Sequence, residues 1–214
     1  MKYFRSLITA LALSTAIITM SLLSIVFDTH FFDQQFTNLW SYERQPTTLT
    51  EAKNLMRYRT NTDTYIDSDV YTQDEIRHLY DVKHLIQKTA FVALWALIIL
   101  GIVVLITTYH WAYPSFWKRS IIRGILFFGI VVWWSIILSL LSFNRLFEQF
   151  HHLFFVDNRQ FPSTSFLIQS YPADFFANAA IQRAFRATIL RFLLYVWVFH
   201  LYKYLRNTTD IHTT

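Results

Sequence analysis

Histidine and aspartate side chains lie close together in one polar part of the chain, and their spacing indicates proton-transfer chemistry. In the segment that follows Gln73, His78 and Asp81 are three residues apart, which places them on one face of a helix. A carboxylate beside an imidazole fixes its tautomer and stabilises its charged form. His84 is also three residues from Asp81, so spacing does not choose between the histidines. The alternative is a solvated helix face with an incidental His–Asp pair, on which Lys83 is a surface charge.

A second pair of histidines, His151 and His152, lies among four phenylalanines in residues 147–155. A histidine has an unperturbed pKa of about 6.5, so it can take or give a proton near neutral pH. Another apolar and aromatic group follows in residues 166–176. Both segments suit a re-entrant or interfacial position in which irregular backbone lines a pocket. The alternative is an aromatic belt that only anchors the protein in a membrane.

Four apolar stretches separate these polar segments, at residues 6–27, 89–112, 124–143 and 187–204. A hydrocarbon core of about 30 Å needs roughly 20 apolar residues as helix, and the first three stretches carry no Asp, Glu, Lys or Arg. The fourth contains Arg191, which can sit near an interface or face the interior of a helix bundle. The sequence therefore predicts an all-α membrane protein with four transmembrane helices, forming a single integral membrane domain over residues 1–214.

The basic residues next to these stretches set the predicted orientation, because cytoplasmic segments are rich in Lys and Arg. They are Lys2, Arg5, Lys118, Arg119, Arg123, Lys203 and Arg206. Both termini are then cytoplasmic. The outer segments 28–88 and 144–183 hold 13 of the 14 acidic residues and face outside. The absence of cysteine favours a bacterial plasma membrane over an animal cell surface.

The composition also excludes several kinds of chemistry. Without cysteine the chain has no disulfide, thiolate nucleophile or cysteine-ligated metal. It has three glycines and no phosphate-binding glycine loop, which argues against nucleotide chemistry. The net charge of +5 follows from the cytoplasmic clusters beside anionic lipid and does not indicate nucleic acid.

Two Thr-x-x-Glu sequences in the first outer segment predict helix starts, because each has the spacing of a capping box. The first is Thr48 with Glu51, and a short helix through about Tyr58 is expected. The second is Thr72 with Glu75, and its helix is expected to run on into the second transmembrane helix.

Three motifs in this order resemble those of the lipoprotein intramolecular transacylases (Lit) of Gram-positive bacteria. The segment 78–83, His-Leu-Tyr-Asp-Val-Lys, is similar to the family's first motif, and residues 147–155 are similar to its second. The third is matched by Leu167-Ile168, Tyr171-Pro172 and Phe175-Phe176. The chain departs from the usual pattern at Arg159, Phe166 and Phe176, where the family commonly has Trp, Asp and Trp.

This resemblance implies a substrate, a reaction and a set of site residues. The substrate is a lipoprotein whose N-terminal cysteine carries a diacylglyceryl thioether and a free α-amine. The sn-2 acyl chain moves to that amine and gives the N-acyl S-monoacylglyceryl, or lyso, form. No cofactor is required, because an ester becomes a more stable amide. The implied catalytic residues are His78 and His151, with Asp81 orienting His78. The implied substrate contacts are Lys83, His152, Arg191 and Phe155.

Two other classes of function remain open from the sequence. One is a membrane metalloenzyme that uses His78, His151 and His152, although no His-Glu-x-x-His pair supports it. The other is a non-enzymatic membrane scaffold whose outer segments bind a partner. Substitution of the histidines separates the scaffold from the enzyme, and metal analysis of the purified protein tests the metalloenzyme.

Overall fold

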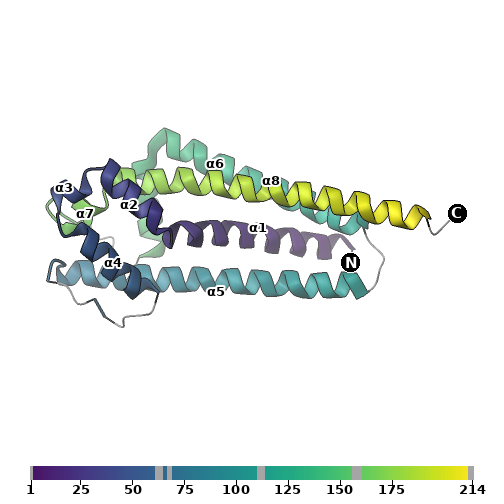
Figure 1. Ribbon diagram of the computed structural model, residues 1–214, viewed down its shortest axis with the longest axis horizontal. Helices are drawn as coiled ribbons and strands as arrows, with labels where there is room; N and C mark the ends of the chain where they lie inside the picture. Colours follow the sequence, from purple (N-terminus) through teal and green to yellow (C-terminus); the bar gives the residue numbers. More distant parts are fainter. Residues whose placement is uncertain (1, 61–64, 67–68, 110–113, 156–160, 212–214) are drawn as a thin grey trace. The chain divides into compact units, whose positions relative to one another are not determined.

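The computed structural model describes residues 2–60, 65–66, 69–109, 114–155 and 161–211. Regular structure within these residues is helical, which confirms the predicted all-α fold. Figure 1 labels the helices along the chain. They are α1 (Lys2–Val26), α2 (Thr29–Asn38), α3 (Ser41–Arg44), α4 (Thr48–Arg59), α5 (Gln73–Tyr109), α6 (Pro114–Phe154), α7 (Phe166–Ser170) and α8 (Ala173–Ile211).

The four predicted apolar stretches fall in the four long helices α1, α5, α6 and α8, apart from residues 110–112, which lie outside the described residues. In the described part of the chain, Leu7–Val26 and Gln73–Val103 are long and apolar enough to cross a membrane. Crossing by all four helices stays a prediction.

The chain divides into two compact units, and each of the long helices contributes to both. Unit 1 comprises Met1–Ser21, Phe91–Ser135 and Ala184–Thr214. Unit 2 comprises Leu22–Ala90 and Ile136–Arg183. All the short helices and the polar outer segments belong to unit 2.

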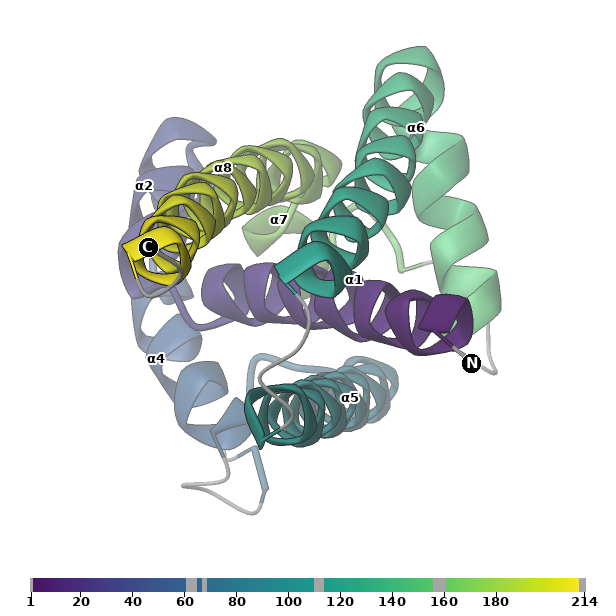
Figure 2. The ribbon, with the colours of Figure 1, turned by 90° about the vertical axis from the view of Figure 1, so that its right-hand side faces the viewer.

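Within unit 1, α1 and α6 approach closely at a pair of small residues. The Ser14 hydroxyl on α1 lies 2.9 Å from the Ala10 carbonyl oxygen and 3.1 Å from the Gly124 carbonyl oxygen on α6. Figure 2 shows the start of α6 beside α1. A Cβ atom added at Gly124 would meet the Ala10 carbonyl oxygen at 3.3 Å. Small residues at this position therefore let the two backbones pack together, as membrane helices commonly do.

The start of α5 in unit 2 confirms the second predicted capping box. The Thr72 backbone N–H and hydroxyl donate to Oε2 of Glu75, at 2.7 and 3.0 Å, and the Glu75 N–H donates to the Thr72 hydroxyl at 3.3 Å. The Glu75 side chain is fully buried and its Oε1 accepts a further bond, at 3.0 Å, from the Leu167 N–H in α7. The predicted continuity of this helix with the second apolar stretch is also confirmed, because α5 runs unbroken from Gln73 to Tyr109.

The first predicted capping box is wrong, although the helix it predicted exists. The N-cap of α4 is Thr47, whose side chain makes no capping bond. The Thr48 hydroxyl instead lies 3.3 Å from the Ser41 carbonyl oxygen and 3.1 Å from the Ser170 hydroxyl. The Thr48 hydroxyl therefore contacts α3 and α7, and it does not cap α4 as the sequence pattern predicted.

The second outer segment is more regular than the sequence predicted. Residues 147–154 continue α6 as helix after a break at Ser142 (φ −169°, ψ 85°), and α8 already begins at Ala173. The irregular backbone considered for this segment is therefore absent from these residues, and its position relative to the membrane stays a prediction. Helices α2 and α3 in the first outer segment had no clear sequence signal.

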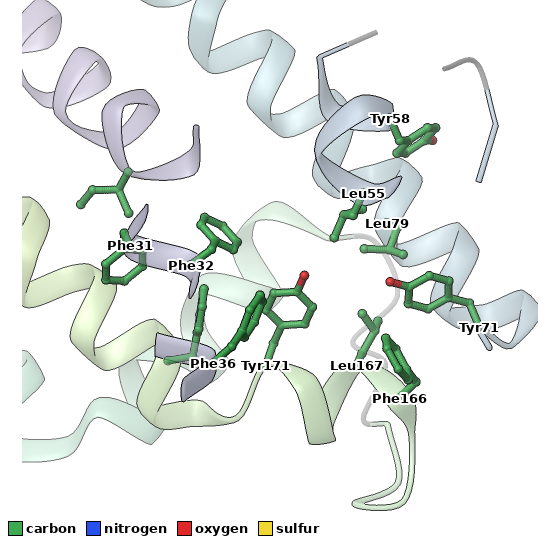
Figure 3. Packing of buried hydrophobic residues seen from close by; sticks show 12 residues of the cluster. Phe31, Phe32, Phe36, Leu55, Tyr58, Tyr71, Leu79, Phe166, Leu167 and Tyr171 are labelled. Atoms are coloured by element: carbon green, nitrogen blue, oxygen red, sulfur yellow. The ribbon is translucent and has the colours of Figure 1, made fainter. Parts of the chain in front are cut away.

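The core of unit 2 is formed by aromatic and aliphatic side chains from six helices (Figure 3). The rings of Phe36 and Tyr171 lie 5.3 Å apart, and those of Tyr71 and Phe166 lie 5.2 Å apart. The buried members are Ile25, Phe31, Phe32, Phe36, Leu55, Tyr58, Tyr71, Leu79, Phe166, Leu167, Tyr171 and Phe175. Part of the predicted aromatic group at residues 166–176 is thus core, whereas Ile168 and Phe176 are exposed.

The α1–α6 contact predicts different effects of the same substitution at two glycines. Gly124→Val should lower the thermal unfolding temperature in detergent, because the branched side chain would press on Ala10, and overpacking costs about 1–3 kcal/mol. Gly101→Val is the matched control, since a Cβ there meets nothing within 4 Å. Equal unfolding temperatures for the two variants would contradict close packing at Gly124.

Candidate active site

Helix α5 turns His78 away from the core of unit 2. Leu79 and Glu75 are buried on the core-facing side of the helix, and successive residues are rotated by about 100°. The His78 side chain is therefore half-buried at the edge of the core. The capping box at Glu75 fixes the start of the helix one turn before His78, so the position of the imidazole depends on that buried carboxylate.

Helix α6 holds the ring of His151 through its own backbone. The Nδ1 atom of His151 lies 2.8 Å from the carbonyl oxygen of Phe147, one turn earlier. A carbonyl oxygen only accepts, so Nδ1 carries the proton and donates it. In the neutral ring the lone pair is then on Nε2. This arrangement leaves Nε2 of His151 as a proton acceptor.

The structure brings the rings of His78 and His151 together within unit 2. Their centroids are 5.8 Å apart and the ring planes differ by 13°. Phe155 lies against both, with its centroid 4.8 Å from that of His78 and 5.2 Å from that of His151. Two imidazoles at this separation, from helices far apart in the sequence, can both reach one substrate group.

Further phenylalanines surround the two imidazoles. The ring of Phe161 lies 5.4 Å from that of His78, and the rings of Phe147 and Phe150 lie 4.2 and 5.8 Å from that of His151. The pair therefore sits in an aromatic environment that suits an acyl chain and lowers the local dielectric constant. Polar interactions made there are stronger than in water.

The structure also places the other residues of the first motif on α5. Asp81 is exposed, three residues after His78 on the same helix. Lys83 is only 9% exposed, and its Nζ atom lies 3.9 Å from the centroid of the Tyr58 ring. The interpretation of Lys83 as a surface charge is therefore wrong, because its position on α5 faces the core.

The remaining candidates are His152, His84 and Arg191. His152 is exposed, one residue beyond His151 on α6. His84 is exposed too, and its ring packs 4.3 Å from that of Tyr80 rather than near His151. The backbone of Arg191 lies in α8, in unit 1, and its side chain is outside the described part of the structure.

Sequence reasoning missed two contributors to the site. Phe161 packs against His78 but follows residues 156–160, which the structure does not describe, and no motif includes it. Glu75 was recognised as a capping residue, yet nothing in its spacing predicted the bond to Leu167. Among the described residues, no group of three or more His, Cys, Asp or Glu side chains is arranged to hold a metal ion.

Comparison with solved structures shows the same fold in a bacterial protein. The chain superposes on the membrane-integral lipoprotein intramolecular transacylase Lit of Bacillus cereus with a TM-score of 0.80 and 18% identity, covering 99% of this chain and 98% of that one. Two single-histidine variants of the same protein, with alanine or arginine, each match with a TM-score of 0.78 and 17% identity. Among curated proteins, no match was found.

The sequence model of one protein family, described as lipoprotein intramolecular transacylase Lit, matches residues 6–176. This range contains both histidines of the pair and most of the chain. The chain therefore belongs to the lipoprotein intramolecular transacylase (Lit) family of intramolecular acyltransferases.

Proposed function

We propose that this protein moves the sn-2 acyl chain of a lipoprotein's S-diacylglyceryl cysteine to the α-amino group of the same cysteine, giving the lyso form. The observation that carries the proposal is the placement of His78 and His151, with nearly parallel rings 5.8 Å apart, among phenylalanine side chains. Family membership supports the reaction class and the lipoprotein substrate.

The reaction needs two proton transfers and no other reagent. The amine nitrogen bonds to the ester carbonyl carbon, and the bond from that carbon to the glycerol oxygen breaks. The α-ammonium loses two protons as it becomes an amide N–H. One of them goes to the leaving glycerol oxygen and the other to solvent. Amine and ester belong to one molecule, so the protein has mainly to hold them in attack geometry.

The hydrogen bond at His151 supports a division of roles between the two histidines. Nδ1 of His151 donates to the Phe147 carbonyl, so Nε2 is the acceptor that can take a proton from the substrate amine. His78 then gives a proton to the leaving glycerol oxygen. General acid–base catalysis of this kind contributes about 10²–10⁴-fold to the rate. Asp81 is proposed to orient His78, whereas the backbone of α6 orients His151.

Further residues form the expected surroundings of the site. Phe155, which touches both imidazoles, and His152, which is exposed beside them, are proposed to contact the substrate, as is Arg191. Lys83, whose Nζ atom lies over the Tyr58 ring, is also proposed to contact the substrate. We propose that the protein is a multi-pass protein of the bacterial plasma membrane, with four crossings, cytoplasmic termini and the histidine pair facing outside.

Substitution of each histidine should remove activity while the variant protein is still inserted in the membrane. In a bacterium that makes diacyl lipoproteins, the wild type should convert them to the N-acyl S-monoacylglyceryl form. His78→Ala and His151→Ala should each lower conversion by about 10²-fold or more. The acyl group only migrates, so fragmentation mass spectrometry of the N-terminal peptide, and not intact mass, must show the amide-linked chain.

The exposed His84 provides the matched control for these substitutions. His84→Ala, on the same helix but packed against Tyr80, should keep full activity. Full activity in both the His78 and His151 variants would reject the two-histidine mechanism and favour a scaffold. A product lighter by one acyl chain would show a deacylase instead.

The orientation can be tested with single cysteines, because the chain has none of its own. Tyr65→Cys lies in the first outer segment on an exposed side chain, and it should react with a membrane-impermeant maleimide in intact cells. Lys118→Cys should react only after the cells are opened. The reverse pattern would place the histidine pair on the cytoplasmic side.

A further inference from the structure

Arg59, near the end of α4, is a buried cation without an acidic partner in the described structure. It is 8% exposed, and its Nε atom is buried with no hydrogen bond. Its contacts include the Met56 sulfur, 3.8 Å from NH2, and the face of the Phe32 ring, whose centroid is 4.7 Å from the guanidinium carbon. Tyr171 and Tyr71 also interact with it electrostatically. Burial lowers the pKa of Arg59. A guanidinium nevertheless stays charged in proteins, so it favours a partner that carries negative charge.

Arg59 also lines an open pocket of about 360 Å³ in unit 2. Three wall residues, Phe27, Ile86 and Ala90, are apolar. The other lining residues are Thr60 and Gln87. The pocket thus combines an apolar wall with a buried cation, which is the combination that an amphiphilic anion requires.

The sequence positions of the lining residues place the pocket where apolar and polar parts of the chain meet. Phe27 directly follows the apolar span Leu7–Val26, and Ala90 lies within the span Gln73–Val103. Arg59 and Thr60 belong to the polar first outer segment. In a bilayer, the acyl chains meet the headgroups at a boundary of this kind, so the two parts of the pocket match the two parts of a lipid.

The pocket is separate from the histidine pair. Ile86 and Ala90 follow His78 by 8 and 12 residues on α5, or about 12 to 18 Å along the helix axis. They also lie about 80° to 120° around the helix from His78. The pocket therefore lies further along α5 than the histidine pair, on a different side of the helix.

We propose that this pocket binds a membrane phospholipid with an anionic headgroup. Its phosphate accepts charge-assisted hydrogen bonds from the guanidinium of Arg59, and one acyl chain lies along Phe27, Ile86 and Ala90. Lys83, one turn before Gln87 on the buried side of α5, adds positive charge to the same part of the unit. The proposal shares membrane insertion with the proposed function but does not depend on acyl transfer.

Native mass spectrometry of the purified full chain can test this binding. The protein in detergent is incubated with equal amounts of phosphatidylglycerol and phosphatidylcholine. Wild type should retain one phosphatidylglycerol with a several-fold preference. Arg59→Gln should abolish the preference, whereas Arg57→Gln, an exposed arginine on the same helix, should keep it. Equal retention of both lipids by wild type, or an unchanged preference in Arg59→Gln, would overturn the proposal.

Two further measurements separate lipid binding from folding defects and from binding of a free anion. Ala90→Trp leaves Arg59 in place and fills the apolar part of the pocket from an exposed position, so it should lower phosphatidylglycerol retention while the unfolding temperature is unchanged. If Arg59→Gln does not fold, unchanged retention by Ala90→Trp rejects the site.

Excess inorganic phosphate should not displace the lipid, and displacement would identify a free-anion site instead. No lipoprotein is present, so an enzyme without transacylase activity still gives a result.

Discussion

The buried carboxylate of Glu75 is the interaction on which the arrangement of unit 2 depends. It accepts hydrogen bonds from the N–H and hydroxyl of Thr72 at the start of α5 and from the N–H of Leu167 in α7. A fully buried carboxylate is tolerated only when its oxygens are bonded in this way. One side chain therefore starts the helix that carries His78 and also joins it to the second outer segment.

The same helix serves two purposes because its residues are divided between two faces. Glu75, Leu79 and Lys83 lie on the core side, where Lys83 packs over Tyr58. His78 lies about 100° away, against Phe155 and His151. Packing of one face therefore sets the angle at which the other face presents its imidazole.

The sequence predicted those features that depend on local spacing or on the order of motifs. Apolar length indicated the long helices, and the Thr72–Glu75 spacing indicated the start of α5. The pairing of His78 with His151 was reached through the family resemblance, because spacing alone left His84 equally eligible. That the rings lie together is a fact of the fold, and their catalytic roles stay a proposal.

The sequence predictions failed at residues where long-range contacts compete with local ones. The Thr48 hydroxyl has the spacing of a cap, yet it contacts Ser41 and Ser170, and the second of these is 122 residues away. Lys83 has the polarity of a surface residue, yet it lies on the buried side of its helix. The contact of Phe161 with His78 had no sequence signal, because an isolated phenylalanine carries no information about its partner.

The proton position on His151 is set by the helix that carries it. Its Nδ1 donates to a carbonyl oxygen four residues earlier, so backbone atoms do what a neighbouring carboxylate does in many active sites. The backbone carbonyl is present whatever residue occupies position 147. The tautomer therefore does not depend on the side chain at position 147, and it is kept as long as the last turns of α6 remain helical.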